Sequence, residues 1–218
     1  MGLVVKKRPN IPTPERVINT IHIQGRNGEL TEDQGTYRDI TISIEFFFKD
    51  YNNFNKKCRC IKAWLLNVTD KTLFFSDDND IFYIVKSVNF ADIERSMKTM
   101  GRFNVDFICA PFEYLRDDNI NIDTPTNIYN PGTFYSEPQL KIYGTGDITL
   151  RINDKNIILK GISNYIILET EIQEAYIEGA SQNNKMTGEF PIFEVGDNNI
   201  SWTGNISKIE IIPRWRFL

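Results

Sequence analysis

NIYNPGTFYSEPQLKIYGTG, residues 127–146, separates two kinds of sequence. Pro131 and Pro138 lack a backbone donor and disfavour the helical region for the residue before them, so this stretch must be extended or turning. The residues before it combine long alternating segments with one helical pattern, whereas the residues after it contain only short alternating segments. We therefore expect a mainly β chain of two domains, residues 1–128 and residues 129–218.

The charge of the chain argues against one class of function. The net charge of −4 divides into −1 for residues 1–128 (17 basic, 18 acidic) and −3 for residues 129–218 (8 basic, 11 acidic). Neither half has the basic surplus of a nucleic-acid-binding protein. No run approaches the roughly 18 apolar residues of a membrane span, and no secretory signal is present, so we expect a soluble protein made inside the cell.

Three cysteines, Cys58, Cys60 and Cys109, are too few and too unevenly placed for a disulfide framework. This agrees with a reducing compartment, and we expect free buried thiols.

The first half begins with an arm. Residues 1–16 contain three prolines and the basic run Lys6-Lys7-Arg8, which predicts an extended segment that lies over a domain surface. From Val17 apolar and polar residues alternate, with Val17, Ile21 and Ile23 on one face, and Arg26-Asn27-Gly28-Glu29 supplies a hairpin turn because Asn-Gly accepts positive φ. Residues 40–48 form the clearest strand, with an apolar residue at every second position.

A helical period follows that strand. Apolar residues recur at spacings of three and four from Tyr51 to Val68, as in an amphipathic helix. We expect Asp50 to cap this helix, because its carboxylate can accept an otherwise unpaired backbone N–H. An Asp-rich turn at residues 77–80 and strands at 81–88, 89–97 and 103–109 complete a β-rich half with one helix.

The second half is a series of short strands. We expect them at residues 140–143, 147–152, 156–159, 165–169, 174–178, 190–193, 199–202 and 207–212. The expected turns between them include Asn153-Asp154, residues 196–199 and Thr203-Gly204-Asn205. Short strands at this regular spacing are typical of an antiparallel sandwich.

Few residues are candidates for catalysis or metal binding. His22 is the only histidine and lies on the polar face of an expected strand, so a second imidazole for a zinc site and a Ser-His pair are both missing. Cys58 and Cys60 are two residues apart on the expected helix, where they point about 200° away from each other and cannot bind one ion together.

The carboxylates give no catalytic prediction either. Asp77-Asp78-Asn79-Asp80 resembles the opening of a calcium loop but lacks the later Gly and Glu of an EF-hand, which favours an ordinary turn. Glu169, Glu171, Glu174 and Glu178 can be considered as a source of paired carboxylates for glycoside hydrolysis, but such a run is usually a solvated face. We predict no catalytic, cofactor-binding or metal-binding residue, and no cofactor.

Ten short motifs occur in an order that resembles one protein family. They are residues 7–12, 25–30, 35–40, 61–65, 82–83, 105–114, 130–133, 136–138, 144–146 and 195–200. Examples are Arg8-Pro9-Asn10, Asn130-Pro131-Gly132-Thr133 and Gly144-Thr145-Gly146. Together they are similar to the distal tail proteins (Dit) of long-tailed, non-contractile bacteriophages or prophages of Gram-positive hosts. The sequence departs from the family at the front, where only Met1 to Val5 stand in place of an additional strand.

This resemblance implies an N-terminal belt domain that forms a six-fold ring and a C-terminal galectin-like β-sandwich that faces outward. It implies a structural hub at the virion tail tip, which joins the tail tube protein to the tail-associated protein and to any baseplate or receptor-binding components. No enzymatic activity, nucleic acid or membrane partner is implied.

A carbohydrate-binding module for host cell-wall glycans is the alternative function, and a glycoside hydrolase is a third. Sugar binding needs an exposed aromatic platform beside amides and carboxylates, for which Trp202, Tyr176 and Tyr165 are the candidates. Each is flanked by apolar residues or strand partners, which favours packing in the core. We expect the second domain to bind sugar weakly or not at all.

Overall fold

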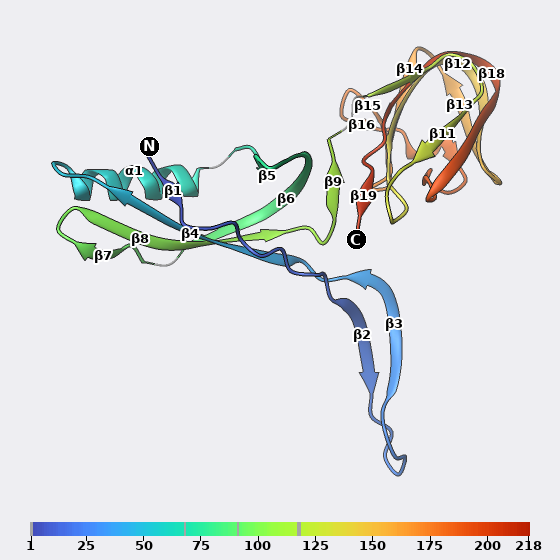
Figure 1. Cartoon of the computed structure of the whole chain (residues 1–218). Coiled ribbons are helices and arrows are strands. Elements are labelled where there is room, and N and C mark those ends of the chain that lie inside the picture. Colours follow the sequence, from blue (N-terminus) through green and yellow to red (C-terminus); the bar gives the residue numbers. More distant parts are fainter. Residues whose placement is uncertain (1, 68, 91, 117–118) are drawn as a thin grey trace. The chain divides into compact units, whose positions relative to one another are not determined.

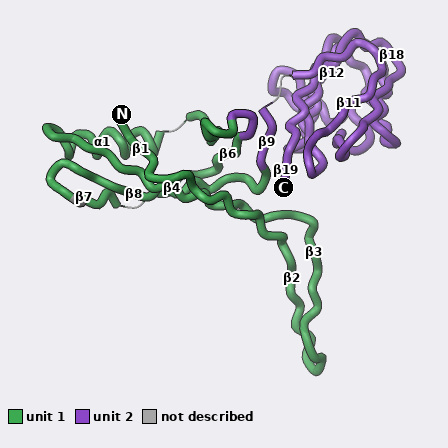
Figure 2. Tube along the Cα trace, in the orientation of Figure 1, with its two compact units in different colours: residues 1–78, 82–112, 218 green, residues 79–81, 113–217 purple. Residues whose placement is uncertain are grey.

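The computed structural model describes residues 2–67, 69–90, 92–116 and 119–218. The chain divides into two compact units (Figure 2): unit 1 comprises Met1–Asp78, Phe82–Phe112 and Leu218, and unit 2 comprises Asn79–Ile81 and Glu113–Phe217. Both units consist mainly of antiparallel strands, and the described residues contain one α-helix. The mainly β fold class with one helix is confirmed.

The division between the units falls earlier in the chain than the expected border at residues 128 and 129. That border lies inside β11 (Thr126–Asn130), which pairs with β18 (Gly196–Ile212) along its whole length. β10 (Ile120–Ile122) also pairs with β18. Residues 113–128 therefore belong to unit 2, because their ladder partners lie there.

Unit 1 is built on an antiparallel sheet in the order β1-β4-β8-β6 (Figure 1). The strands are β1 (Val4–Val5), β4 (Ile40–Lys49), β8 (Met100–Cys109) and β6 (Asp78–Phe90), with β5 (Thr72–Phe75) paired to β6 and β7 (Glu94–Met97) paired to β8. β4 buries Ile40, Ile42, Ile44 and Phe48, which confirms the alternation read from the sequence. Val105 and Phe107 of β8 lie opposite on the same face.

Two features of this unit differ from those expected. The Asp-rich turn is limited to Ser76 and Asp77, since Asp78–Asp80 already belong to β6. The strand expected over residues 89–97 is replaced by the end of β6 and by β7, and residue 91 lies outside the described residues.

The N-terminal arm lies over unit 1, as expected. β1 pairs with the edge of β4, and the amide of Lys6 donates to the carbonyl of Glu45 at 3.0 Å. Arg8 forms an ion pair with Asp77, its guanidinium carbon lies 4.3 Å from the centre of the Phe75 ring, and Pro9 is buried.

The helix α1 (Phe54–Leu66) is shorter than the expected stripe, and Val68 lies outside the described residues. It buries Ile61 and Leu65, and Phe54 stacks on Phe48 with the ring centres 5.3 Å apart. The predicted capping role of Asp50 is wrong. Asn53 is the N-cap and forms no side-chain capping bond, while Asp50 accepts the amides of Asn52 and Asn53 (3.0 and 2.6 Å) and closes a turn one step before the helix.

The hairpin of β2 (Arg16–Ile21) and β3 (Leu30–Tyr37) is a two-stranded ribbon; within the described residues these strands pair only with each other. In the loop over residues 22–29, which contains His22, the hydrogen-bonded turn lies earlier than expected: the amide of Arg26 donates to the carbonyl of Ile23 at 3.2 Å, whereas Asn27 and Gly28 form only a bend. The apolar face predicted from the alternation is not buried: Ile21 and Ile23 are exposed, as are Ile18 and Leu30.

Unit 2 contains an antiparallel sheet in the order β10-β18-β12-β14-β15-β16. The further elements are β12 (Gln139–Ile152), β13 (Lys155–Ile162), β14 (Tyr165–Glu169), β15 (Glu174–Ile177), β16 (Ala180–Ser181), the 3₁₀ turn Asn183–Lys185 and β17 (Met186–Thr187). β13 pairs with β12 and β17, and β9 (Glu113–Leu115) pairs with β19 (Arg216–Phe217). Side chains from β10 to β15 and from β18 share one hydrophobic core.

Two pairs of expected short strands are in fact single long strands. Residues 140–143 and 147–152 belong to β12, and residues 199–202 and 207–212 belong to β18. The expected turn at Thr203-Gly204-Asn205 is wrong: the β12–β18 register shifts there instead, with Gly204 at φ +99°. Glycine inside a strand pattern marks such an irregularity as readily as a turn.

Two further features of this half need correction, and one is confirmed. The strand expected over 190–193 is reduced to one bridge between Phe193 and Ser136, and residues 196–199 open β18 instead of turning. The Asn153-Asp154 turn is confirmed, with Asn153 at φ +53°.

Substituting Gly144 tests the close contact of the two long strands. A Cβ at this position would lie 2.3 Å from the carbonyl oxygen of Asn205, so Gly144→Ala must push the backbones apart. We expect a loss of about 1–3 kcal/mol in the free energy of unfolding, the usual cost of overpacking, measured by urea denaturation. The adjacent exposed Thr145→Ala is the control; an equal loss in both variants would contradict the explanation.

Candidate functional site

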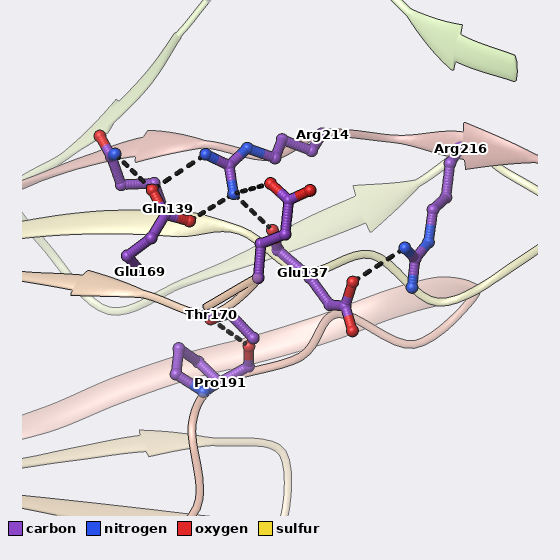
Figure 3. Close-up of polar contacts among 8 residues, drawn as sticks. Glu137, Gln139, Glu169, Thr170, Pro191, Arg214 and Arg216 are labelled. Atoms are coloured by element: carbon purple, nitrogen blue, oxygen red, sulfur yellow. Dashed lines mark hydrogen bonds and ion pairs between the residues drawn. The ribbon is translucent and has the colours of Figure 1, made fainter. Parts of the chain in front are cut away.

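In unit 2, the two arginines Arg214 and Arg216 and the three glutamates Glu137, Glu169 and Glu171 form a polar group that we call the arginine cluster (Figure 3). Arg214 follows β18, and both ends of its guanidinium bind the carboxylate of Glu169 at the end of β14, with Nη2 to Oε2 at 3.0 Å. Gln139 donates from Nε2 to Oε2 of Glu169 at 2.7 Å. The second carboxylate near Arg214, that of Glu171, lies 3.4 Å from Nη1 and is half exposed.

The neighbouring Arg216 holds a different segment. Its Nη1 donates to Oε2 of Glu137 at 2.9 Å, and its Nε donates to the carbonyl of Tyr135 at 2.6 Å. The guanidinium carbon also lies 4.7 Å from the centre of the Tyr135 ring. Arg216 is buried, so these contacts fix the C-terminal strand against residues 135–137.

Burial and pairing set the protonation states in this cluster. Burial lowers the pKa of Arg214, but its hydrogen bond and charge interaction with Glu169 outweigh burial and raise that pKa overall. Burial raises the pKa of Tyr114, and the nearby Arg216 partly offsets the rise. The carboxylates of Glu169 and Glu137 are each bound by an arginine. The cluster is suited to holding segments together rather than to proton transfer.

The glutamate run considered for glycoside hydrolysis does not behave as one solvated face. Glu169 is buried against Arg214, which corrects the expectation for this residue, whereas Glu171 and Glu178 are exposed and Glu174 is half-buried. Sequence reasoning missed the pair because Arg214 is 45 residues from Glu169. One local signal could have indicated the Glu169–Arg214 pair: Arg214 and Arg216 flank Trp215, which is buried.

The remaining sequence candidates lie apart from one another. His22 is exposed beyond the end of β2, and Asp77 is paired with Arg8. Within the part of the chain that the structure describes, no three His, Cys, Asp or Glu residues gather as a metal site would require.

The three thiols differ in burial. Cys60 is exposed, contrary to the expectation of buried thiols, because the period of helix α1 turns it away from the core side chains Ile61 and Leu65. Cys58 lies on the same helix face as Ile61 and Leu65 and is half-buried. Cys109 is buried, and burial raises its pKa to about 12.

The aromatic candidates for a sugar platform do not form one. Trp202 is half-buried and packs against the core of unit 2, opposite Leu150 in the β12–β18 ladder. Tyr165 lies beside Tyr143, with ring centres 5.9 Å apart, and the ammonium of Lys141 lies 4.7 Å from the centre of the Tyr165 ring. Tyr176 is half-buried on β15.

Comparison with known proteins finds a family model and a solved structure that this chain resembles. Residues 5–109 match the family model of the phage tail protein RIFT-related domain. The crystal structure of SPP1 Dit (gp 19.1), described as a paradigm of the hub adsorption apparatus in phages that infect Gram-positive hosts, superposes with a TM-score of 0.73. The two chains are 11% identical, and the match covers 100% of this chain and 94% of the other.

No curated protein matches this chain. None of the described helices has the length and apolar character needed to span a membrane. The resemblance to Dit proteins drawn from the sequence motifs is confirmed by the family model and by the shared fold.

Removing the charge of Glu169 tests the arginine cluster. We expect Glu169→Gln to lower the free energy of unfolding by about 3 kcal/mol, because it leaves Arg214 without its buried counter-charge. The control Glu171→Gln removes an exposed carboxylate near the same arginine and should change stability by less than about 1 kcal/mol. Chemical denaturation of the two variants measures both values. A smaller loss for Glu169→Gln than for Glu171→Gln would refute this description of the cluster.

Truncating Trp202 distinguishes a core residue from a sugar platform. If Trp202 packs in the core, Trp202→Ala should lower stability by about 3 kcal/mol, as other large aromatic truncations do. The exposed Tyr129 provides the control, since Tyr129→Ala should leave the melting temperature nearly unchanged. Glycan-array binding by the wild type that disappears in a Trp202→Ala protein of unchanged melting temperature would sink the core assignment.

Proposed function

We propose that this chain, a Dit-type phage tail protein by its family-model match and its fold, is a structural hub of the virion tail tip. The observation that carries the proposal is the fold shared with SPP1 Dit over the whole chain, together with the tail-protein family match in residues 5–109. In this role the chain works by binding and geometry and has no enzymatic activity.

Unit 1 has surfaces suited to joining copies of the chain. The β2–β3 hairpin carries Ile18, Ile21, Ile23 and Leu30, which are between 37% and 49% exposed. An isolated two-stranded hairpin is only marginally stable in water, and exposed apolar groups on such a ribbon mark an interaction surface. Burial of this hairpin against a second copy would remove its apolar side chains from water.

The sheet of unit 1 has a second open surface. Helix α1 contributes Ile61 and Leu65 to the core, but the strand residues of the opposite face, such as Thr41, Ser43 and Asn104, are exposed. At the edge, Val4 and Val5 of β1 are also exposed. A sheet with an open face and edge is suited to contacts between subunits.

We assign the ring contacts to unit 1, within the expected domain 1–128. When one surface of a subunit contacts a different surface of the next identical subunit, the assembly forms a ring if repeated rotation brings the last subunit back to the first. The number of six subunits follows from the resemblance to Dit proteins. Such a ring would join the tail tube protein on one side to the tail-associated protein on the other.

Unit 2 is assigned the outward role of a galectin-like sandwich that holds baseplate or receptor-binding components. Its core is complete, and its C-terminal strand is held by the arginine cluster, so it is suited to act as a rigid support. The alternative of a glycan-binding module lacks the platform it was thought to use, because Trp202 packs against the core and Tyr165 is covered by Lys141. The hub is therefore the function that we favour.

Light scattering coupled to size exclusion tests the ring. We expect the full-length chain to form a closed oligomer and the double variant Ile21→Asp/Leu30→Asp to be monomeric, because charges on the hairpin prevent its burial. Ile172→Asp is the matched control: Ile172 is an exposed apolar residue of unit 2 (63%), and its substitution should leave the oligomer intact.

The opposite pattern contradicts the assignment. If Ile172→Asp dissociates the oligomer while the hairpin variant remains assembled, unit 2 carries the contacts. The thermal melt of Ile172→Asp should be unchanged, since its side chain lies on the surface. The hairpin variant should unfold at a lower temperature than the wild type, because it loses the stabilisation that assembly provides.

A further inference from the structure

Unit 1 contains a depression of about 570 Å³ between the start of helix α1 and the segment after β7. Its wall includes four basic residues, Lys56, Arg59, Arg95 and Lys98, and we call it the basic depression. All four side chains are exposed. Asp50 is the one acidic residue among the described residues of the wall.

The cations of the basic depression lack counter-charges. None of the four forms an ion pair with a carboxylate in the described part of the chain, whereas Lys155, Lys208, Arg214 and Arg216 of unit 2 are all paired. Asp50 offsets only one of the four positive charges, and its carboxylate is held by the amides of Asn52 and Asn53 instead of by one of these cations. Like charges gathered around one hollow repel one another unless an anion enters it.

This concentration of positive charge is local. Helix α1 contains four basic residues, Lys56, Lys57, Arg59 and Lys62, and no acidic residue, although the whole chain has a net charge of −4. Such segregation in an acidic protein creates a local field that attracts an acidic partner.

One of the four cations is held in place. The guanidinium carbon of Arg95 lies 4.6 Å from the centre of the Phe54 ring, and its Nη2 donates to the carbonyl of Lys98 at 2.7 Å. Arg95 is therefore ordered before any partner arrives, which lowers the entropy cost of binding.

We propose that the basic depression is a docking site for an acidic polypeptide segment of another tail protein. The charge favours carboxylates, and the wall also presents Tyr51, which is 76% exposed, and the amides of Asn52, Asn53 and Asn55. Aromatic and arginine side chains beside amides are typical of protein interfaces. A nucleic acid is a poorer fit, because its backbone needs a long basic surface and this chain has a pI near 5.2.

The inference rests on the proposed hub function for the identity of the partner as a tail protein. The binding itself is tested with the full-length chain and a fluorescently labelled poly-L-glutamate peptide, by anisotropy at low and high salt. We expect binding that weakens with salt and that falls about tenfold or more in Lys56→Glu/Arg59→Glu.

The control is Lys160→Glu/Lys185→Glu, which changes the net charge equally but lies in unit 2. It should bind the peptide within about twofold of the wild type, since rim charges remote from a site act only through the screened field. The neutral variant Lys56→Gln/Arg59→Gln should lose an intermediate amount of peptide affinity. It replaces Lys56→Glu/Arg59→Glu in the test if the charge-reversed protein does not fold. Equal losses in the two charge-reversed proteins, or no binding by the wild type, would overturn the proposal.

Two further measurements exclude other occupants. A DNA duplex that binds as tightly as the peptide and is lost in the same variant would assign the site to nucleic acid instead. Loss of the oligomer in Lys56→Glu/Arg59→Glu by light scattering would assign it to a second copy of this chain; we expect the oligomer to persist. A wild-type protein that is monomeric but binds the peptide would contradict the proposed ring and leave the docking site supported. The two proposals can therefore be refuted independently.

Discussion

The backbone of Gly144 passes so close to that of Asn205 that no side chain fits between them, and unit 2 is organised around the strand pair joined there. β12 pairs with β13, β14 and β18, while β18 also pairs with β10 and β11. The register shifts at Gly144, and the pair supplies inward side chains to a single core from both of its ends, while residues 145–147 and 203–205 in its middle are exposed. The shorter strands β10, β11, β13 and β14 each pair with one of these two long strands.

The two units differ in how many of their apolar side chains are buried and how many of their charged side chains are paired. In unit 2 the apolar side chains gather in one core and two buried or half-buried arginines are bound by glutamates. In unit 1 the isoleucines of the β2–β3 hairpin are exposed, and the four cations of the basic depression form no ion pair with a carboxylate in the described residues. This contrast fits a division in which one unit supplies contacts for assembly and the other supplies a rigid support.

Local patterns predicted the parts of the fold that depend on neighbours in sequence. The alternation in residues 40–48 and the stripe that contains Ile61 and Leu65 led to the correct strand and helix, because burial on one face imposes these periods. The turn assigned to Gly204 failed, since glycine serves a turn and a bulged strand equally well. The Glu169–Arg214 pair was invisible, because only the folded sheet brings the two residues together.

The way the chain enters and leaves unit 2 has a consequence for how such proteins diversify. β9 at its entry pairs with β19 at its exit, with Tyr114 opposite Arg216, and the amide of Leu115 donates to the carbonyl of Trp215 at 2.9 Å. A domain whose first and last strands pair side by side resembles an inserted domain, and folded proteins tolerate domain insertion well. Recombination can therefore exchange everything between the two strands for another module while the rest of the chain keeps its sequence.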